Sequence, residues 1–306
     1  MTTVPSVAVL GASGFVGSAV VEALEHRGVE VRRVPSPRLS SSARGAAELS
    51  TQLAAPGLER EVESLRSALA GCSVVVNAAG LATATAGGDD ALVGADALLP
   101  GVVARAAPPA ARLVHVSSAA VQGRREVLDE SLGTSPFSPY SAAKAWGEAL
   151  VQERGGATVC FRPTSVHGHG RAVTRTLARA LGSPLATVAG DGERPTPQVL
   201  VANVADAIAY VATCSEQPPP VVLQPWEGLT TAGLVRLLGG REPVHLPEPL
   251  ARTVVGSGYR VARWSGRAAG IARRLDMMWF GQRQEPGWLE TRWQAPYGQD
   301  AWRDLA

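Results

Sequence analysis

Short apolar runs alternate with helix-like repeats through the first half of the chain. Residues 7–10 form an apolar run that ends at Gly11, and apolar residues then recur at helical spacing up to Gly28. Further apolar runs predict strands at 29–34, 73–77, 112–117 and 158–162, and helix-like repeats cover 59–70, 91–107 and 138–153. Strands that alternate with helices favour a parallel sheet covered on both faces. The pattern therefore predicts an α/β fold with a doubly wound parallel sheet.

The alternation also divides the chain. It fades after residue 166, where prolines cluster and most of the tryptophans follow. We expect a first domain over 1–165, whose sheet also receives later strands, and a smaller mixed lobe over 166–306. The segment 35–55 is rich in Ser, Pro, Arg and Ala, so its expected third strand cannot be located from periodicity.

Composition and charge narrow the function classes. The 306 residues are 45% hydrophobic and carry a formal net charge of +2, which excludes a protein that coats nucleic acid or another polyanion. The three cysteines lie far apart, without the spacing of a disulfide framework or a zinc site. The first residues have no charged segment followed by a long apolar one, and nowhere do 18 apolar residues run together, so we expect neither a leader peptide nor a membrane span. We expect a cytoplasmic protein without a bound metal, a nucleic-acid partner or an integral membrane segment.

A glycine-rich turn joins the first predicted strand to the first predicted helix. In the run GASGFVG, Gly11 allows a tight turn, Gly14 lets a pyrophosphate approach the backbone, and Gly17 lets the helix pack closely on the strand. The start of the helix then offers unpaired N–H groups to the pyrophosphate. The candidate cofactor-binding residues of this turn are Gly11, Ser13, Gly14, Phe15, Val16 and Gly17. A turn with packing glycines in another kind of α/β protein is the alternative.

The end of the second predicted strand bears on the choice of dinucleotide. A carboxylate there would hold the ribose 2′-OH of NAD, and the segment 32–38 contains none. A hydroxyl and a guanidinium suit a 2′-phosphate instead, so Ser36 and Arg38 favour NADP over NAD. A solvated basic loop is the alternative explanation of Arg38.

Candidate catalytic groups follow the later strands. Of the 29 basic residues only Lys144 is a lysine, and it lies four residues after Tyr140, so helical spacing places both on one face. A neighbouring ammonium favours the phenolate and suits Tyr140 to general acid–base catalysis. Ser118, at the end of the strand predicted over 112–117, adds a hydrogen-bond donor for a substrate oxygen. The alternatives are that Tyr140 and Lys144 form an ordinary pair on the protein surface and that Ser118 is an ordinary turn residue.

In this order the motifs resemble those of the extended short-chain dehydrogenase/reductases, also called the NAD-dependent epimerase/dehydratase family. The resemblance takes in Asn77-Ala78-Ala79-Gly80, residues 116–123, Phe161-Arg162-Pro163 and residues 201–206, and it covers about two thirds of the chain. It implies a Rossmann-like fold in which Ala78, Ala79 and Pro163 help to bind the cofactor. It also implies that Ser118 and Tyr140 hold the substrate oxygen, while Lys144 binds the nicotinamide ribose and lowers the pKa of the tyrosine.

The sequence departs from the family pattern near the expected substrate. Sugar dehydratases carry an Asp-Glu pair just after the serine, and Ala119 and Ala120 stand here instead, so the acid and base of dehydration are missing. Gln122 stands where the family usually has tyrosine, and His167-Gly168-His169 where Tyr-Gly-Pro is commoner. These departures leave the substrate open.

By the same resemblance the second lobe covers the substrate, commonly a nucleoside diphosphate sugar, and an arginine there often clamps the diphosphate. The candidates are Arg252, Arg260, Arg263, Arg267, Arg273 and Arg274. Ordinary solvated arginines are the alternative.

Three functions follow from the sequence. The first is an NADP-dependent (alternatively NAD-dependent) reductase or epimerase acting on a keto or hydroxyl carbon, above all of a nucleotide-linked sugar. The second applies the same chemistry to a small ketone, such as a secondary metabolite or a sterol-like alcohol. The third is a non-catalytic NADP-binding sensor or scaffold, which the presence of both Tyr140 and Lys144 disfavours. The resemblance further implies a homodimer formed through helices of the first domain.

Overall fold

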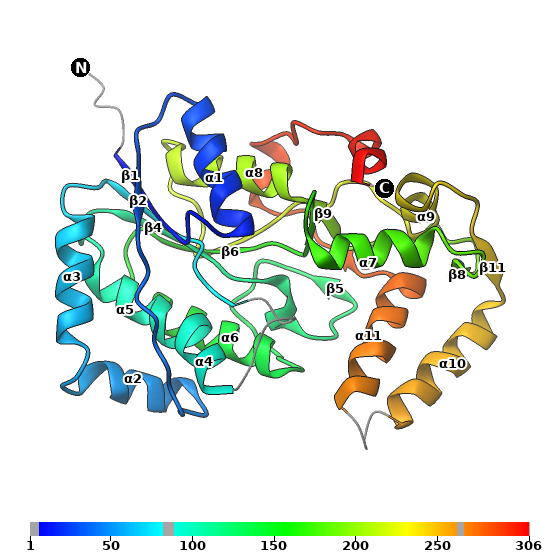
Figure 1. Ribbon diagram of the computed structural model, residues 1–306, viewed down its shortest axis with the longest axis horizontal. Coiled ribbons are helices and arrows are strands. Elements are labelled where there is room, and N and C mark those ends of the chain that lie inside the picture. Colours follow the sequence, from blue (N-terminus) through cyan, green and yellow to red (C-terminus); the bar gives the residue numbers. More distant parts are fainter. Residues whose placement is uncertain (1–5, 82–88, 262–265, 306) are drawn as a thin grey trace.

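The computed structural model describes residues 6–81, 89–261 and 266–305, and the side chains of 266–271 and 274 lie outside this description. Its centre is a six-stranded sheet in the order β10-β6-β4-β3-β1-β2, in which every pair of neighbours is parallel (Figure 1). The strands are β1 (Val7–Leu10), β2 (Val31–Val34), β3 (Val74–Asn77), β4 (Arg112–Val116), β6 (Thr158–Arg162) and β10 (Val221–Leu223). The predicted doubly wound α/β fold is confirmed.

Helices cover both faces of this sheet (Figure 1). One layer consists of α1 (Phe15–His26) and α8 (Val201–Thr213), and the other of α3 (Glu59–Leu69), α5 (Leu99–Ala106) and α6 (Pro139–Gln152). Alternate side chains of a strand point to opposite faces. Val9 accordingly lies in the apolar cluster of the α1 layer, and Leu10 lies in that of the α5 layer. Two apolar cores, one on each face, therefore fix the sheet between the helices.

The expectation of a third strand within 35–55 was wrong. No sheet strand lies between β2 and β3, and that part of the chain instead forms α2 (Ala46–Ala54) before α3. The buried residues Leu49 and Leu53 face the core from α2 at helical spacing. The Ser- and Pro-rich stretch 35–45 has no run of β-branched residues that would add a strand to the edge beside β2.

The helix predicted over 91–107 is interrupted. It consists of α4 (Asp89–Val93), a π-helical turn η2 (Gly94–Leu98) and α5. A Cβ atom at Gly94 would overlap the carbonyl oxygen of Leu39, because the loop after β2 packs directly on this turn. Turns of π-helix are frequent at functional sites, and Asp96 lies within this one.

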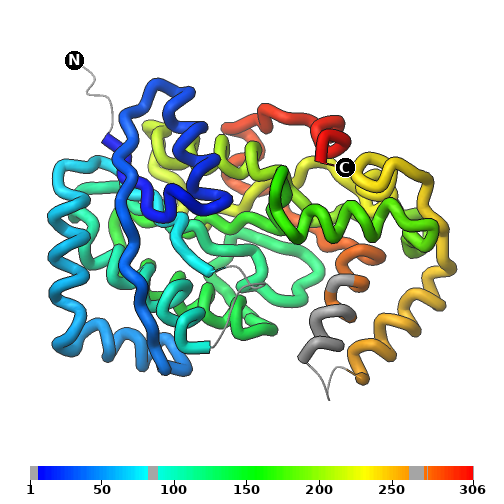
Figure 2. The backbone as a smooth tube through the Cα atoms, in the orientation of Figure 1, coloured from blue at the N-terminus to red at the C-terminus, as the bar shows by residue number. Residues whose placement is uncertain are grey.

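The other described elements lie outside this sheet and its helix layers, and most of them belong to the second lobe (Figure 1). They are η3 (Ala119–Gln122), β5 (Val127–Leu128), β7 (Ser165–His167), α7 (Ala172–Leu181), β8 (Thr187–Ala189), β9 (Gln198–Leu200), α9 (Thr231–Gly239), β11 (Val244–Leu246), α10 (Glu248–Val261), α11 (Gly266–Phe280), β12 (Arg283–Gln284), η5 (Trp288–Thr291) and η6 (Gln299–Leu305). Figure 2 shows the C-terminal segment folded back beside α9, and Trp302 of that segment is fully buried with Leu181 and Leu238. The chain crosses between the two parts more than once, since α8 and β10 lie on the first sheet and β12 pairs with β5.

A buried ion pair fastens α6 to the sheet. Arg162, at the end of β6, donates from Nε and Nη2 to the two carboxylate oxygens of Glu148 on α6, at 2.9 and 2.6 Å. Its Nη1 donates to the carbonyl oxygen of Ser131 at 2.7 Å. The side chains of Arg162 and Glu148 are 0% and 5% exposed, so each charge depends on the other for stabilisation.

Arg162→Met should remove about 3–5 kcal/mol from the free energy of unfolding, because it leaves the Glu148 carboxylate buried and unpaired. Guanidinium chloride denaturation measures this loss. The control is Arg283→Met, which breaks an ion pair with Glu126 whose side chains are 60% and 82% exposed. We expect no measurable loss there, and equal losses in the two variants would contradict the anchoring role of Arg162.

Candidate active site

The candidate residues converge at one edge of the sheet. In a doubly wound sheet, ligands bind beyond the carboxyl ends of the strands. Past these ends, the N–H of Ala78 donates to the carbonyl of Leu10 at 3.0 Å, and the N–H of Ala119 donates to the carbonyl of Pro163 at 2.9 Å. The turn after β1, the segments after β3 and β4, and Pro163 therefore lie side by side.

The glycine turn has the geometry that its residues predict. Gly11 has a φ of +75°, and a Cβ there would lie 2.6 Å from the backbone nitrogen of Ala79. A Cβ at Gly17 would overlap the carbonyl oxygen of Gly11. Gly14 is the N-cap of α1, and no side chain caps that end. The first N–H groups of α1 therefore remain available to an anion.

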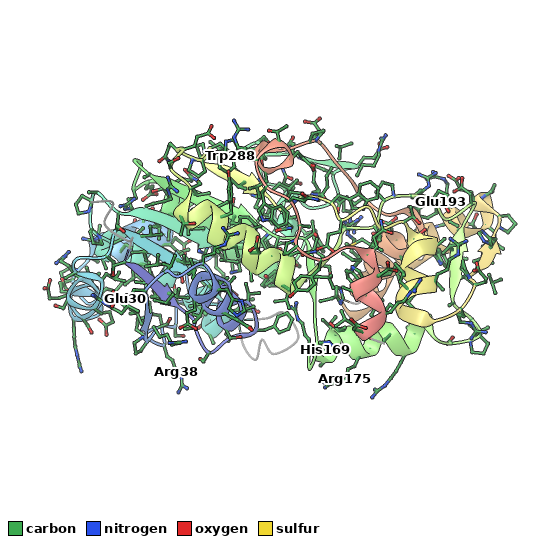
Figure 3. The ribbon with its side chains drawn as sticks, turned by 90° about the horizontal axis from the view of Figure 1, so that it is seen from above. Glu30, Arg38, His169, Arg175, Glu193 and Trp288 are labelled. Carbon is green, nitrogen blue, oxygen red and sulfur yellow. The ribbon has the colours of Figure 1, made fainter. Side chains whose placement is uncertain are left out.

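These features fit a dinucleotide. Ser13 and Gly14 are exposed on the turn, and Phe15 and Val16 are partly buried at the start of α1. The hydroxyl oxygen of Ser36 is buried without a hydrogen-bond partner among the described residues. Arg38 is exposed, and Figure 3 shows it at the margin of the first domain. The backbone cradle suits a pyrophosphate, and the unpaired hydroxyl suits a polar group of the same ligand.

Tyr140 lies in the first turn of α6. Ser138 caps this helix by accepting from the N–H of Ser141 at 3.2 Å, and the Ser141 hydroxyl accepts from the N–H of Ser138 at 3.0 Å. Pro139 at the first helical position has the backbone angle that a helix requires. This capping box fixes the turn that carries Tyr140, and the partial positive charge of the helix end favours an anion there.

Ser118 lies between β4 and η3, as the N-cap of η3. Its hydroxyl oxygen accepts from the N–H of Ala120 at 3.2 Å, so its own O–H remains free to donate. The side chain is partly exposed at the ligand edge. Ser118 can therefore donate a hydrogen bond to an oxygen bound at this edge.

Lys144 is buried beneath the same edge. Its Nζ donates to the carbonyl of Val116 at 3.2 Å and lies 3.0 Å from Oδ1 of Asp96, with the two side chains 7% and 0% exposed. Burial disfavours the charged lysine, but the charge of Asp96, and next that of Tyr140, oppose this effect, and the pKa of Lys144 is raised. Burial raises the pKa of Asp96 despite the neighbouring ammonium.

Sequence reasoning missed Asp96 and Arg171. Asp96 is a single carboxylate in an otherwise apolar part of its segment, and that isolation was the available signal. Arg171 stacks its guanidinium 4.7 Å from the ring centre of Phe15, beside the glycine turn. Desolvation lowers the pKa of Arg171, and the charge of Tyr140 acts in the opposite direction, so this cation lies within electrostatic reach of the phenol.

Two of the family departures have structural roles. Gln122 is buried and donates from Nε2 to Asp129 Oδ1 at 2.6 Å, which closes the loop after η3. His167 is buried against Oε1 of Gln198, 2.6 Å from its Nε2, and desolvation lowers its pKa to about 4. His169 is exposed, and Figure 3 shows it near the start of α7. Gln122 and His167 are therefore engaged within the protein.

A basic cavity opens in the second lobe beside the loop that follows η3. Its volume is about 480 Å³, and its arginines are Arg124, Arg125, Arg194, Arg252, Arg273 and Arg283, against the acids Glu126 and Asp276. Arg273 donates to the carbonyl of Gly123 at 3.1 Å and lies 5.6 Å from the ring centre of Phe137. It therefore links the cavity to the segments that lead from Ser118 and to Tyr140.

The lobe arginines predicted from the sequence fall into three groups. Arg252 and Arg273 line the cavity, whereas Arg260 is exposed and bonds within its own helix. Arg263 lies outside the described residues, as do the side chains of Arg267 and Arg274.

Fold and site together define a dinucleotide-binding α/β protein. The chain belongs to the NAD dependent epimerase/dehydratase family, whose model matches residues 7–223. This family is NAD(P)-dependent.

One curated relative shares 37% identity over 170 residues, which are 52% of this chain and 50% of the relative. It is the 4-hydroxy-2-methyl-3-oxo-4-farnesyl-3,4-dihydroquinoline-1-oxide ketoreductase of Stigmatella aurantiaca. The alignment thus spans about half the length of that relative.

Solved structures share the fold at low identity. A human epimerase family protein with NADPH is 20% identical, with a TM-score of 0.62 and 98% of each chain covered. The dTDP-4-dehydrorhamnose reductase of Bacillus anthracis with NADP is 19% identical, with a TM-score of 0.56, and the match covers 79% of this chain and 83% of the reductase. The UDP-glucuronic acid 4-epimerase of Bacillus cereus with NAD is 18% identical, with a TM-score of 0.57, and the match covers 79% of this chain and 87% of the epimerase.

None of the helices in the described residues is both long and apolar enough to cross a membrane. In the same residues, no group of three or more His, Cys, Asp or Glu side chains is placed to hold a metal ion.

Gly17→Ala should weaken NADPH binding at least about tenfold and lower the melting temperature, because its Cβ would overlap the Gly11 carbonyl and move α1 away from the turn. Fluorescence titration and thermal unfolding measure these effects. Gly256→Ala in α10 is the control, since a Cβ there meets nothing within 4 Å. Unchanged NADPH affinity in Gly17→Ala would rule out the turn as the pyrophosphate site.

Proposed function

We propose that this protein is an NADP-dependent reductase that delivers hydride to a ketone, with Ser118, Tyr140 and Lys144 as its catalytic residues. The observation that carries the proposal is the buried Lys144, held at the end of β4 on the same helix as Tyr140. A surface Tyr–Lys pair would have an exposed lysine, and the side chain of Lys144 is only 7% exposed.

The three side chains supply the proton chemistry of the reduction. The bound nicotinamide supplies the hydride. Ser118 donates a hydrogen bond to the ketone oxygen, and Tyr140 donates its phenolic proton to the same oxygen as negative charge develops there. The ammonium of Lys144 and the start of α6 stabilise the phenolate that remains on Tyr140. The reverse reaction uses the same groups, so an epimerase that oxidises and then reduces one carbon could use this site as well.

NADP is favoured over NAD by the loop after β2. Ser36 has an unpartnered buried hydroxyl, and Arg38 has a free guanidinium among the described residues. Together they supply the donors that a 2′-phosphate requires. The candidate cofactor contacts also include Ala78, Ala79 and Pro163, beside the glycine turn.

A nucleotide-linked 4-keto sugar is the first substrate class, and the basic cavity supports it. Most cavity arginines pair with acids, such as Arg194 and Arg252 with Glu248. Arg124 has no acidic partner among the described residues and stacks 3.9 Å from the ring centre of Tyr259. A diphosphate suits such a group because guanidinium N–H donors match phosphate oxygens. The dTDP-4-dehydrorhamnose reductase with the same fold bears a name of this substrate class.

A small-molecule ketone is the second candidate. It is favoured by the 37% identity to a ketoreductase whose named substrate is a farnesylated quinoline oxide. The catalytic residues would be the same, and only the contents of the second lobe would differ.

The homodimer and the cytoplasmic location remain predictions. Helix α2 packs on α5 and α6, and the hydroxyl of Ser50 donates to Glu153 at 2.7 Å across this contact. A dimer through helices of the first domain would therefore use faces that α2 leaves open.

Tyr140→Phe should lower kcat by about 10²–10⁴-fold, because the variant cannot donate a proton to the developing alkoxide. NADPH oxidation in the presence of a ketone measures the rate, and the NADPH dissociation constant should stay within about twofold of wild type. The control is Tyr297→Phe, at a residue that is 51% exposed in the second lobe. Full turnover by Tyr140→Phe would rule out the proposed proton donor.

Uridine diphosphate should bind the wild-type protein, and Arg124→Ala should weaken this binding at least about fivefold, since a charge-assisted contact contributes about 1–3 kcal/mol. Calorimetric titration measures the affinity, with Arg60→Ala on α3 as the control for loss of an exposed arginine. Absence of binding, together with NADPH-dependent reduction of neutral aromatic ketones, would favour the second candidate over the first.

A further inference from the structure

The π-helical turn η2 packs on α6, and this packing brings Asp96 of η2 against Lys144 of α6. We propose that Asp96 is a positioning residue of the reductase, which holds the Lys144 ammonium group in place at the carboxyl end of β4. This inference rests on the proposed function and assigns a role to a residue outside the Ser-Tyr-Lys set.

The contacts of Lys144 explain how a carboxylate would act through it. An ammonium group has three N–H donors. One of them donates to the carbonyl of Val116 at 3.2 Å, and Nζ also forms an ion pair with Oδ1 of Asp96 at 3.0 Å. The described residues offer Nζ no further hydrogen-bond partner or ion pair, so the ammonium keeps N–H donors for a ligand at this edge of the sheet.

Tight packing holds the Asp96 carboxylate itself. Its Oδ2 accepts from the N–H of Leu81 at 3.3 Å. A Cβ at Gly80 would overlap Oδ1 of Asp96 and would lie 3.1 Å from Nζ of Lys144. The backbone after β3 therefore packs directly against the ion pair.

The charges around Lys144 come from three elements. Besides Asp96 on η2, the groups that act on it are Tyr140 and Glu148 on α6 and His115 on β4. Burial, and next the charge of Lys144, lower the pKa of His115 well below its usual value, so this histidine is neutral. Glu148 is engaged by Arg162. Asp96 is therefore the one carboxylate among the described residues that contacts the ammonium directly.

The sign of the pH effect follows from these surroundings. Asp96 opposes the burial that favours neutral Lys144, and the pKa of Lys144 is raised. Without the carboxylate, burial acts unopposed except by weaker partners, so the pKa of Lys144 falls. NADPH affinity and kcat, which depend on the charged ammonium in the proposed function, should then be lost at a lower pH than in the wild type.

The test is Asp96→Asn, which keeps the shape and removes the charge. NADPH affinity and kcat are measured across pH, by fluorescence titration and by NADPH oxidation with a ketone. We expect the alkaline limb of both profiles to move down by about one pH unit or more, and kcat at neutral pH to fall about tenfold. Wild-type limbs and a wild-type kcat in Asp96→Asn would overturn the proposal.

Glu227→Gln is the matched control. Glu227 is a mostly buried carboxylate of the second lobe, which accepts from the N–H of Leu200 at 2.9 Å, from Asn203 at 2.8 Å and from Trp302 at 3.1 Å. Its loss should lower stability and leave both pH profiles unmoved. An equal shift in this control would mean that lost buried charge, rather than contact with Lys144, moves the limbs, and would overturn the proposal.

If Asp96→Asn alone does not fold, the same substitution is tested in a protein that already carries Lys144→Met. In Lys144→Met there is no ammonium to hold, so adding Asp96→Asn should cause no further loss of NADPH affinity and should raise the melting temperature by relieving an unpaired buried carboxylate. A further loss of affinity would overturn the proposal. Wild-type protein that turns over no ketone would count against the reductase, while the NADPH-binding measurements would still test Asp96.

Discussion

The buried pair between Arg162 and Glu148 is the constraint on which the site depends. Two charges without solvent are tolerable only when their geometry is right, and here both carboxylate oxygens receive a guanidinium N–H. The pair joins the end of β6 to the middle of α6. Sliding α6 by one turn would separate the charges and leave each buried alone. The register of α6 on the sheet is therefore fixed by electrostatics as well as by packing.

That register fixes the chemistry, because the functional groups lie at helical spacing from the anchor. Tyr140, Lys144 and Glu148 follow one another at intervals of four residues, on one face of α6. Glu148 is held by Arg162, and Lys144 is held by Asp96 and the carbonyl of Val116. Tyr140 is carried by the capped first turn of the helix. Three different elements thus set the position of one helix face. Such preorganisation is what proton transfer in a reductase requires.

The sequence reveals those parts of the molecule that depend on neighbours along the chain. Strand and helix alternation, the glycine turn and the Tyr140–Lys144 spacing are local patterns, and the structure has them in the expected places. The partner of Lys144 was not predictable in this way, because Asp96 meets it only through the packing of η2 on α6. The same holds for Arg162 and Glu148. A motif shows that a charged group is present, but the group that neutralises it is found only in three dimensions.

Because no strand forms after β2, the loop there packs against the helical segment that carries Asp96. Without a strand to continue the sheet, the loop after β2 rests on the helical segment that follows β3: the carbonyl of Leu39 abuts Gly94, and the N–H of Ser41 donates to the carbonyl of Asp90 at 3.0 Å. Ser36 and Arg38 belong to this loop, and Asp96 lies two residues beyond Gly94. The segment that faces the cofactor's ribose in the proposed function is thus packed on the turn that holds Lys144. Since any side chain at Gly94 would push the two apart, this glycine sets the loop after β2 and the π-helical turn at once.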